Sequence, residues 1–215
     1  MKYVTHLDMM RFWERALRRA DVPLAYSEGF SPHAQIAMAA PLPVGVTSVG
    51  ELMDVFLEAP MRPRAFAGQV APQLPGAVTI TDVREVALTL PALQADVRAA
   101  EYEVDVPGAS PDEVSAAVGR FLAAETIPWE HKREDEVRQY DIRSMVRDLH
   151  VARADGDAVT IAMWLKNDST GSGRPEQVVA ALGYRAPLRI HRVKLLLEER
   201  SRVMDAWRKH GRFAG

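Results

Sequence analysis

Side chains that could do acid–base or nucleophilic chemistry gather near the N-terminus, around a loop rich in serine and glycine. They are His6, Asp8, Tyr26, Ser27, Glu28, Ser31 and His33. A serine with a histidine and an acid is the composition of a hydrolytic triad, but a triad is defined by geometry, and the sequence contains no G-x-S-x-G elbow. The simpler interpretation is a turn at Ser27, Glu28 and Gly29, whose residue types favour local hydrogen bonds. In the catalytic interpretation, the acid–base residues are His6, Asp8, Tyr26 and His33.

The same region offers three groups that could bind a metal ion, namely His6, Asp8 and His33. The H-x-D spacing is not specific to any metal site, and the other four histidines are scattered along the chain. The chain has no cysteine, which removes disulfides, thiol nucleophiles and thiolate-ligated zinc or iron–sulfur sites. We therefore predict no metal site.

Four arginines share one face of a helix predicted from about residue 5 to residue 20. Thr5 and Asp8 are spaced as a capping box, and Pro23 closes the helix because proline cannot continue it. At 100° per residue, the apolar residues fall on one arc of this helix. The arginines on the opposite arc are Arg11, Arg15, Arg18 and Arg19. Guanidinium groups this close repel one another unless a polyanion, or nearby acids such as Glu14, neutralises them.

The charge of the chain is unevenly distributed. Its net charge is −2, but residues 1–131 carry −7 and residues 132–215 carry +5. A basic second half is a weak indication of a polyanion partner. The segment from Gly171 to Pro175 adds flexible backbone and Arg174 just before a predicted helix, where anions bind. The candidate nucleic-acid or anion-binding residues are Arg11, Arg15, Arg18, Arg19, Arg143, Lys166, Arg174, Arg192 and Lys194.

The aromatic residues are few and mostly spaced as core residues. Trp13, Trp129 and Trp164 each lie in an apolar periodic segment, so no platform for stacked bases is expected. Phe30, in the loop after the arginine helix, is the best single candidate for an exposed ring.

The order of predicted elements indicates an α+β fold made of two ferredoxin-like (β-α-β-β-α-β) halves with antiparallel sheets. The expected domains are residues 1–90, residues 99–200 and a basic tail over 201–215. In the first half the strands are expected at 2–5, 35–39, 51–57 and 78–83, with helices at 5–20 and 63–74. In the second half we expect strands at 101–106, 129–133, 158–165 and 188–197, with helices at 110–123 and 175–182.

The composition is that of a folded globular protein, with 215 residues that are 47 % apolar and 26 % charged. No apolar run is long enough for a membrane span or a secretory signal. We therefore expect a cytoplasmic protein.

One long motif occupies residues 6–45. It combines HLD, the arginine helix, YSEGFSPH and PLPVG, and its loop residues are Ser27, Glu28, Gly29, Phe30 and Pro32. This pattern closely resembles the uncharacterised radical-SAM-linked protein family, a bacterial domain of unknown function. Ala34 stands where that family usually has proline, a change that only loosens the loop. Glu51 with Asp54 also fits, and the run Asp141–Ile142–Arg143 resembles a weaker second motif.

The resemblance implies a protein found beside, or fused to, a radical SAM enzyme, which would itself hold the iron–sulfur cluster and S-adenosylmethionine. No cofactor is then expected on this chain. Our leading hypothesis is a non-catalytic accessory or substrate-presenting protein, with RNA as the candidate polyanion. Two alternatives remain open: an RNA-processing or RNA-modifying enzyme that uses the four acid–base residues, and a protein–protein adaptor whose arginine face docks an acidic surface.

Overall fold

The computed structural model describes residues 2–133 and 136–198, without the side chains of residues 132, 133 and 136. This part of the chain divides into two compact units. The first comprises residues 2–44, 51–96 and 197–198, and the second comprises residues 45–50 and 97–196. The second unit therefore takes one short segment from the N-terminal half. The predicted tail over 201–215 lies outside the described residues.

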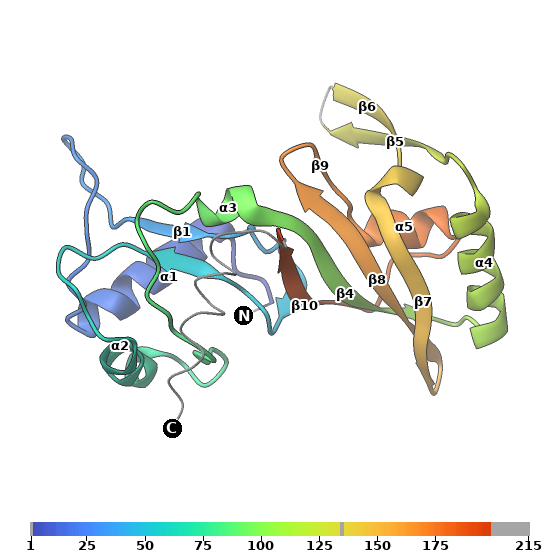
Figure 1. Ribbon diagram of the computed structural model, residues 1–215. Coiled ribbons are helices and arrows are strands. Elements are labelled where there is room, and N and C mark those ends of the chain that lie inside the picture. The colour runs from blue at the N-terminus through green and yellow to red at the C-terminus, as the bar shows by residue number, and fades with distance from the viewer. Residues whose placement is uncertain (1, 134–135, 199–215) are drawn as a thin grey trace. The chain divides into compact units, whose positions relative to one another are not determined.

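The elements of both units are drawn in Figure 1. The helices are α1 (His6–Arg19), α2 (Pro63–Val70), α3 (Leu93–Asp96), α4 (Pro111–Ala123) and α5 (Pro175–Ala181), with short 3-10 turns at Ala71–Gln73 and Arg143–Met145. The strands are β1 (Ile36–Met38), β2 (Val46–Ser48), β3 (Met53–Val55), β4 (Val97–Pro107), β5 (Pro128–Arg133), β6 (Glu136–Asp141), β7 (Val146–Asp155), β8 (Ala158–Asp168), β9 (Gly171–Ser172) and β10 (Arg189–Leu197). None of the helices in the described ranges is both long and apolar enough to span a membrane.

Helix α1 is bounded by local hydrogen bonds. The Thr5 hydroxyl oxygen accepts the backbone N–H of Asp8 at 3.2 Å, which confirms the predicted start. At the other end, Asp21 takes a positive φ of 51°, and the N–H of Val22 reaches back to the Leu17 carbonyl at 3.2 Å. This is a Schellman ending with aspartate at the position where glycine is usual. Because Val22 and Leu17 are both buried, the ending also turns the chain back into the core.

The core of the first unit forms between α1, the segment that follows it, and α2. Its buried members are Leu17, Ala20, Val22, Leu24, Ala34 and Val70. Side chains from β1, β3 and the loop after α2 pack around them, among them Ile36, Val55 and Ile80. This packing buries the apolar arc of α1 and leaves the arginine arc to solvent.

The prediction of a ferredoxin-like fold for the N-terminal half is wrong. In the first unit the described residues form one two-stranded sheet, in which β1 pairs with β3 in antiparallel register. Residues 2 and 3 form a turn, and Thr5 caps a helix instead of extending a strand. Residues 78–83 form no regular element; Ile80 packs on the core from a loop. Residues 78–83 have the apolar alternation of a strand, but they have no partner strand and therefore remain irregular.

The second unit has an α+β arrangement around a larger sheet. The strand order is β2-β10-β4-β8-β7, with β9 added to β8. Strands β4, β7 and β8 pair in antiparallel register, whereas β2 runs parallel to β10. Alternate residues of β4 and β8 are buried, including Val104, Ile161 and Met163, and α4 and α5 contribute buried residues such as Val114 and Val178.

Helix α4 confirms its predicted boundaries. Ser110 accepts the backbone N–H of Glu113 at 3.2 Å, and the Glu113 carboxylate accepts the backbone N–H of Ser110 at 3.1 Å, which completes a capping box. The predicted helix at 175–182 and the final predicted strand correspond closely to α5 and β10.

The backbone of β10 lies close to Gly50, at the end of the 45–50 segment. A Cβ atom at this position would lie 2.4 Å from the Val193 carbonyl oxygen and 3.0 Å from the Lys194 Cα. Because both atoms belong to backbone, Gly50→Ala should lower the free energy of unfolding by about 1–3 kcal/mol, measured by urea denaturation followed by circular dichroism. Gly119→Ala is the matched control, because nothing lies within 4 Å of its Cβ position in α4. The control should gain about 1 kcal/mol, and equal effects of the two changes would contradict the close approach.

Candidate anion-binding site

The arginine face of α1 comprises Arg11, Arg15, Arg18 and Arg19, all exposed. Three of them, Arg11, Arg15 and Arg19, line an open pocket of about 320 Å³ together with Asp8 and Phe12. The pocket lies along successive turns of one helix, so its lining residues are held at fixed spacing. Three guanidinium groups and one carboxylate give the pocket a net positive charge.

The acids near α1 neutralise the arginine face only in part. Asp8 is 3.7 Å from Arg11, and Glu14 is 3.9 Å from Arg18. Arg19 donates to the backbone carbonyl of Gln73 at 3.2 Å, which positions its guanidinium, and it forms no ion pair with a described acidic residue. Arg15 has no hydrogen bond or ion pair within the described part of the chain. A guanidinium group in this state can pair with a phosphate through two parallel hydrogen bonds.

The four predicted acid–base residues all lie in the first unit, but no hydrogen bond connects them among the described residues. His6 begins α1, and Asp8 is held in its first turn by Thr5 and Arg11. Tyr26 and His33 lie in the loop after α1, where His33 Nδ1 is 3.0 Å from the Ser27 hydroxyl. Across the described ranges, no hydrogen bond links any two of His6, Asp8, Tyr26 and His33. Nor do three or more of the described histidine, aspartate and glutamate side chains gather as a metal site.

Most basic candidates in the second unit are occupied by groups of that unit. Arg143 donates to the carbonyl oxygens of Val146 at 2.8 Å and Leu122 at 3.4 Å. Lys166 lies 3.8 Å from Asp168, and Lys194 lies 3.9 Å from Glu101. Arg174 is exposed just before α5. Arg143, Lys166 and Lys194 are thus engaged within the unit, whereas the Arg174 side chain has no hydrogen bond or ion pair among the described residues.

Arg192 corrects the prediction for the last strand. Arg192 and Lys194 were both predicted to bind a nucleic acid or an anion, but Arg192 is only 1 % exposed. Arg192 lies on β10, which is an inner strand between β2 and β4. Lys194 does remain exposed. Arg192 therefore cannot contact a phosphate backbone at the surface.

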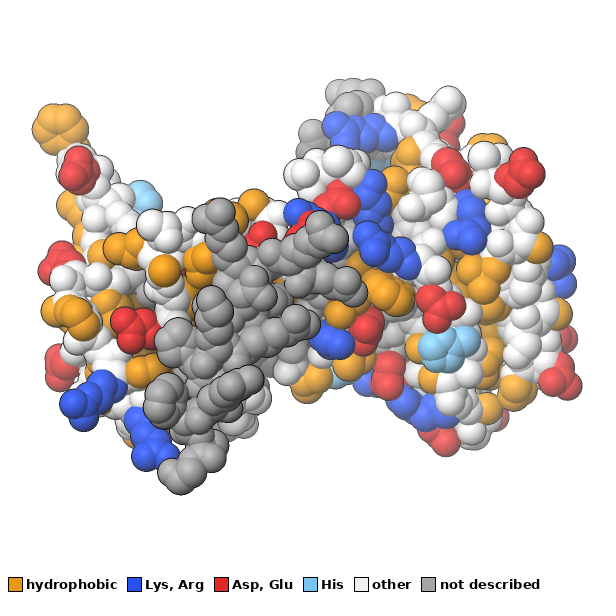
Figure 2. All heavy atoms as spheres, viewed as in Figure 1, with side chains coloured by type: hydrophobic (Ala, Val, Ile, Leu, Met, Phe, Trp, Pro, Cys, Tyr) orange, Lys and Arg blue, Asp and Glu red, His pale blue; other side chains and the backbone are white. Residues whose placement is uncertain are grey.

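The solvent-facing side of β4 carries a charge network that the sequence did not indicate. Arg153 pairs with Glu103 at 3.0 Å, and Arg189 pairs with Asp105 at 2.7 Å. The hydrogen bond from Arg153 is the main cause that lowers the pKa of Glu103, and Arg189 adds to it. For Asp105, burial raises the pKa, but hydrogen bonds from Arg189 and Thr160 outweigh this and lower it overall. Figure 2 shows acidic and basic side chains intermixed over the second unit.

Trp164 also differs from its prediction as a core residue. It is 39 % exposed on β8, and the Arg147 guanidinium lies 5.9 Å from the centre of its ring, within the range of a cation–π contact. Strand alternation could have identified it, because Ile161, Met163 and Leu165 have the opposite parity and are buried. The alternation was missed because Trp164 lies in a continuous apolar run of β8.

Glu103→Gln tests the charge network. Because the folded state lowers the pKa of Glu103, this carboxylate stabilises the protein above its ordinary pKa of 4.5, and the contribution is lost as the pH falls toward the lowered value. At pH 7 the variant should lose about 0.5–1 kcal/mol of unfolding free energy, a modest value because the pair is partly solvated. The difference from the unmodified chain should shrink progressively as the pH falls below 4.5, measured by urea denaturation across pH.

The control for this prediction is Glu85→Gln. Glu85 is exposed and has no hydrogen bond or ion pair within the described ranges, so its replacement should be neutral at every pH. A loss for Glu103→Gln that persists unchanged at low pH would show that the carboxylate charge is not responsible.

Comparisons with known proteins match a family model and show weak similarity to solved structures, of which two are given below. The model of a family described as "Uncharacterized protein conserved in bacteria (DUF2344)" matches residues 1–175. No curated protein matches the sequence. A chain of a Cbf5–Nop10–Gar1 complex aligns with a TM-score of 0.48 at 13 % identity, over 91 % of this chain and 46 % of that chain. A chain of an archaeal box H/ACA sRNP Nop10–Cbf5 complex aligns with a TM-score of 0.42 at 13 % identity, over 89 % and 44 %. The protein thus spans less than half the length of either chain.

Proposed function

The chain belongs to the DUF2344 family of proteins conserved in bacteria, and we propose that it is a non-catalytic accessory or substrate-presenting protein that works with a radical SAM enzyme and binds RNA through the arginine face of α1. The observation that carries the RNA part is the pocket in which Arg11, Arg15 and Arg19 converge, with Arg15 unpaired among the described residues. The surface that binds the phosphates is then set by one rigid helix.

The arrangement of the arginines favours an extended polyanion over a single small anion. From Arg11 to Arg19 the helix rises about 12 Å, so the face can meet several phosphates in succession. Phe12 lies in the same pocket and gives it an apolar wall beside the cations. RNA offers phosphates and planar bases together, which suits a site with both kinds of group.

The radical SAM partner is supported by the motif over residues 6–45 and by the chemistry that this chain lacks. Without cysteine, the chain cannot itself provide thiolate ligands for an iron–sulfur cluster. The cluster and S-adenosylmethionine would be held by the partner enzyme, while this chain would bind and orient the substrate. Arg15 and its neighbours would then act as positioning residues.

We also propose that the second unit is a ferredoxin-like unit with an inserted pair of strands. Its support is the chain order β4-α4-β7-β8-α5-β10 and the order of these strands in the sheet, β10-β4-β8-β7. Strands β5 and β6 lie between α4 and β7 in the chain and form a separate two-stranded sheet. Strand β2 adds to the edge of the unit beside β10.

The double variant Arg11→Glu, Arg15→Glu tests the arginine face. Single-stranded RNA should bind the unmodified protein with an affinity that falls steeply with salt, because phosphate contacts release counterions. Reversing two charges should weaken binding at least about tenfold and flatten the log–log salt slope by about 1.4, from about 0.7 per lost contact. Fluorescence anisotropy at several salt concentrations measures both quantities.

The matched control is Arg62→Glu, Arg64→Glu, which makes the same charge change at two exposed arginines at the start of α2 in the same unit. Affinity should change little in this variant. Absence of RNA binding, binding without salt dependence, or an equal loss in the control would each reject the arginine face as the RNA site.

Affinity capture of the tagged full chain from its source cells tests the partner. We expect a radical SAM enzyme to co-purify both with and without nuclease treatment, because the proposed contact is between proteins. Recovery of RNA without such an enzyme would reject the accessory role and favour an autonomous RNA-binding protein. Analysis of the bound proteins by mass spectrometry and of the bound RNA by sequencing distinguishes these results.

A further inference from the structure

The loop after α1 is a structured hairpin, which we name the aromatic finger and define as residues 26–34. Tyr26 and Ala34 form an antiparallel bridge at its base. The Ser27 N–H donates to the His33 carbonyl at 2.9 Å, and the His33 N–H donates to the Ser27 hydroxyl at 3.1 Å. Gly29 permits the tight reversal at the tip, because its φ of 121° is accessible to glycine and strained for other residues. The finger therefore has a defined shape.

The base of the aromatic finger is anchored in the first unit. Gln35 donates from its backbone to the Ala25 carbonyl at 2.8 Å and from its side chain to the Tyr26 carbonyl at 3.2 Å. Phe56 bonds both sides of the base: its carbonyl accepts the Ala25 N–H at 2.9 Å, and its N–H donates to the Gln35 carbonyl at 3.0 Å. Ala34 itself is buried in the core. Movement of the base is thus coupled to the packing of the whole unit.

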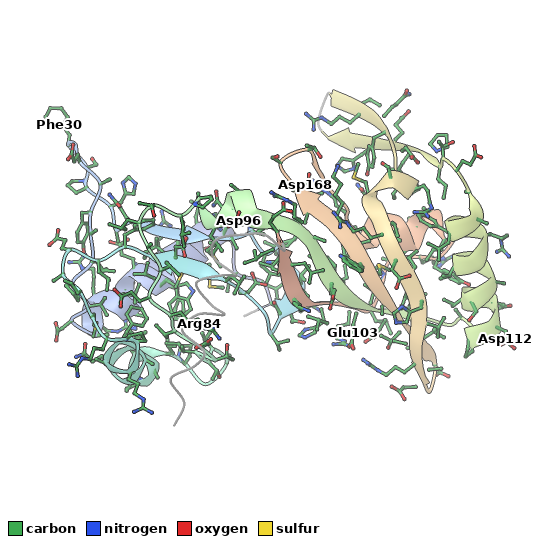
Figure 3. The ribbon with its side chains drawn as sticks, viewed as in Figure 1. Phe30, Arg84, Asp96, Glu103, Asp112 and Asp168 are labelled. Carbon is green, nitrogen blue, oxygen red and sulfur yellow. The ribbon has the colours of Figure 1, made fainter. Side chains whose placement is uncertain are left out.

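The tip of the finger carries a fully exposed aromatic ring. Phe30 lies at the end of the projecting loop, as labelled in Figure 3, and the rings of Tyr26 and Phe56 are partly exposed near the base. Because its ring is fully exposed, Phe30 adds nothing to the packing of the described residues. On a preorganised loop it can fill a pocket of another molecule with little loss of conformational freedom, which is the property of an interface anchor.

The charge of the aromatic finger favours a basic protein surface over a phosphate backbone as its occupant. Residues 20–61 contain no lysine or arginine and five acidic residues, of which Glu28 lies exposed in the finger next to Gly29. Figure 2 shows hydrophobic and acidic atoms, and no lysine or arginine, along the projecting loop. An RNA backbone would be repelled here, whereas a protein surface with lysine or arginine would be attracted.

We propose that the aromatic finger is a docking element for a partner protein, with Phe30 inserted into an apolar pocket whose rim carries lysine or arginine. The arginine face of α1 and the aromatic finger are then two sites of opposite chemistry on one unit. The inference rests on the proposed function only in requiring a partner protein, because RNA binding by the arginine face does not depend on Phe30.

Site-specific photo-crosslinking in the source cells tests the occupant of the finger. Phe30→p-benzoylphenylalanine in the full chain should give one discrete protein adduct that resists nuclease. Leu88→p-benzoylphenylalanine is the matched control, because Leu88 is another well-exposed apolar residue of the first unit. Mass spectrometry should place the adduct in a peptide that joins apolar residues with lysine or arginine. Adducts to RNA, the same adduct from both positions, or no adduct at position 30 would overturn the proposal.

Competition with unlabelled variants then tests the ring and the charge. The unmodified chain should compete for adduct formation, and Phe30→Ala should compete about tenfold less well or worse, which corresponds to about 1.4 kcal/mol. Glu28→Lys should also compete less well, because it reverses the attraction to a basic rim. Competition by Glu28→Lys that equals or exceeds the unmodified chain would overturn the basic rim.

The RNA affinity of Phe30→Ala separates this inference from the proposed function. It should equal that of the unmodified chain, whereas the arginine-face double variant should lose RNA and still compete for the adduct. Loss of RNA affinity in Phe30→Ala would place the ring at the RNA site and overturn the docking element. Circular dichroism checks that each variant is folded. We expect Phe30→Ala and Glu28→Lys to fold normally, because both side chains are exposed.

Discussion

Burial of the apolar arc of α1 is the constraint on which the first unit depends. Leu17 and Ala20 can leave water only if α1 lies against Leu24, Ala34 and Val70. Because the helix has two faces, the same contact turns its arginines outward. The contact also places Ala34 in the core, and Ala34 is one side of the base of the aromatic finger. One hydrophobic contact therefore positions both candidate sites.

In the second unit, net charge is a poor guide to the available charge. Residues 132–215 carry an excess of basic residues. Yet Arg153 and Arg189 are paired with Glu103 and Asp105, and Arg143 is bonded to two backbone carbonyls. Arg15, which has no hydrogen bond or ion pair among the described residues, lies instead in the half of the chain with net negative charge. An anion site depends on which cations lack an internal partner, and this is a property of the fold.

The two candidate sites of the first unit have complementary chemistry. The arginine face offers guanidinium groups beside an aromatic ring, which suits a polyanion. The aromatic finger offers an exposed ring beside a carboxylate, which suits an apolar pocket with a basic rim. An accessory protein that brings a nucleic acid to an enzyme would need two such surfaces that do not compete for the same partner.

The sequence by itself determined the features that depend on neighbours within a few residues. The start of α1 at Thr5 and the capping box at Ser110 follow from local hydrogen bonds. Tertiary structure alone decided the partner of the 45–50 segment, the burial of Arg192 and the pairing of Arg189 with Asp105, which are 84 positions apart. The physical reason is that the free energy of a strand edge or a guanidinium group depends on the groups that the fold packs against it. Residue type alone does not specify those neighbours.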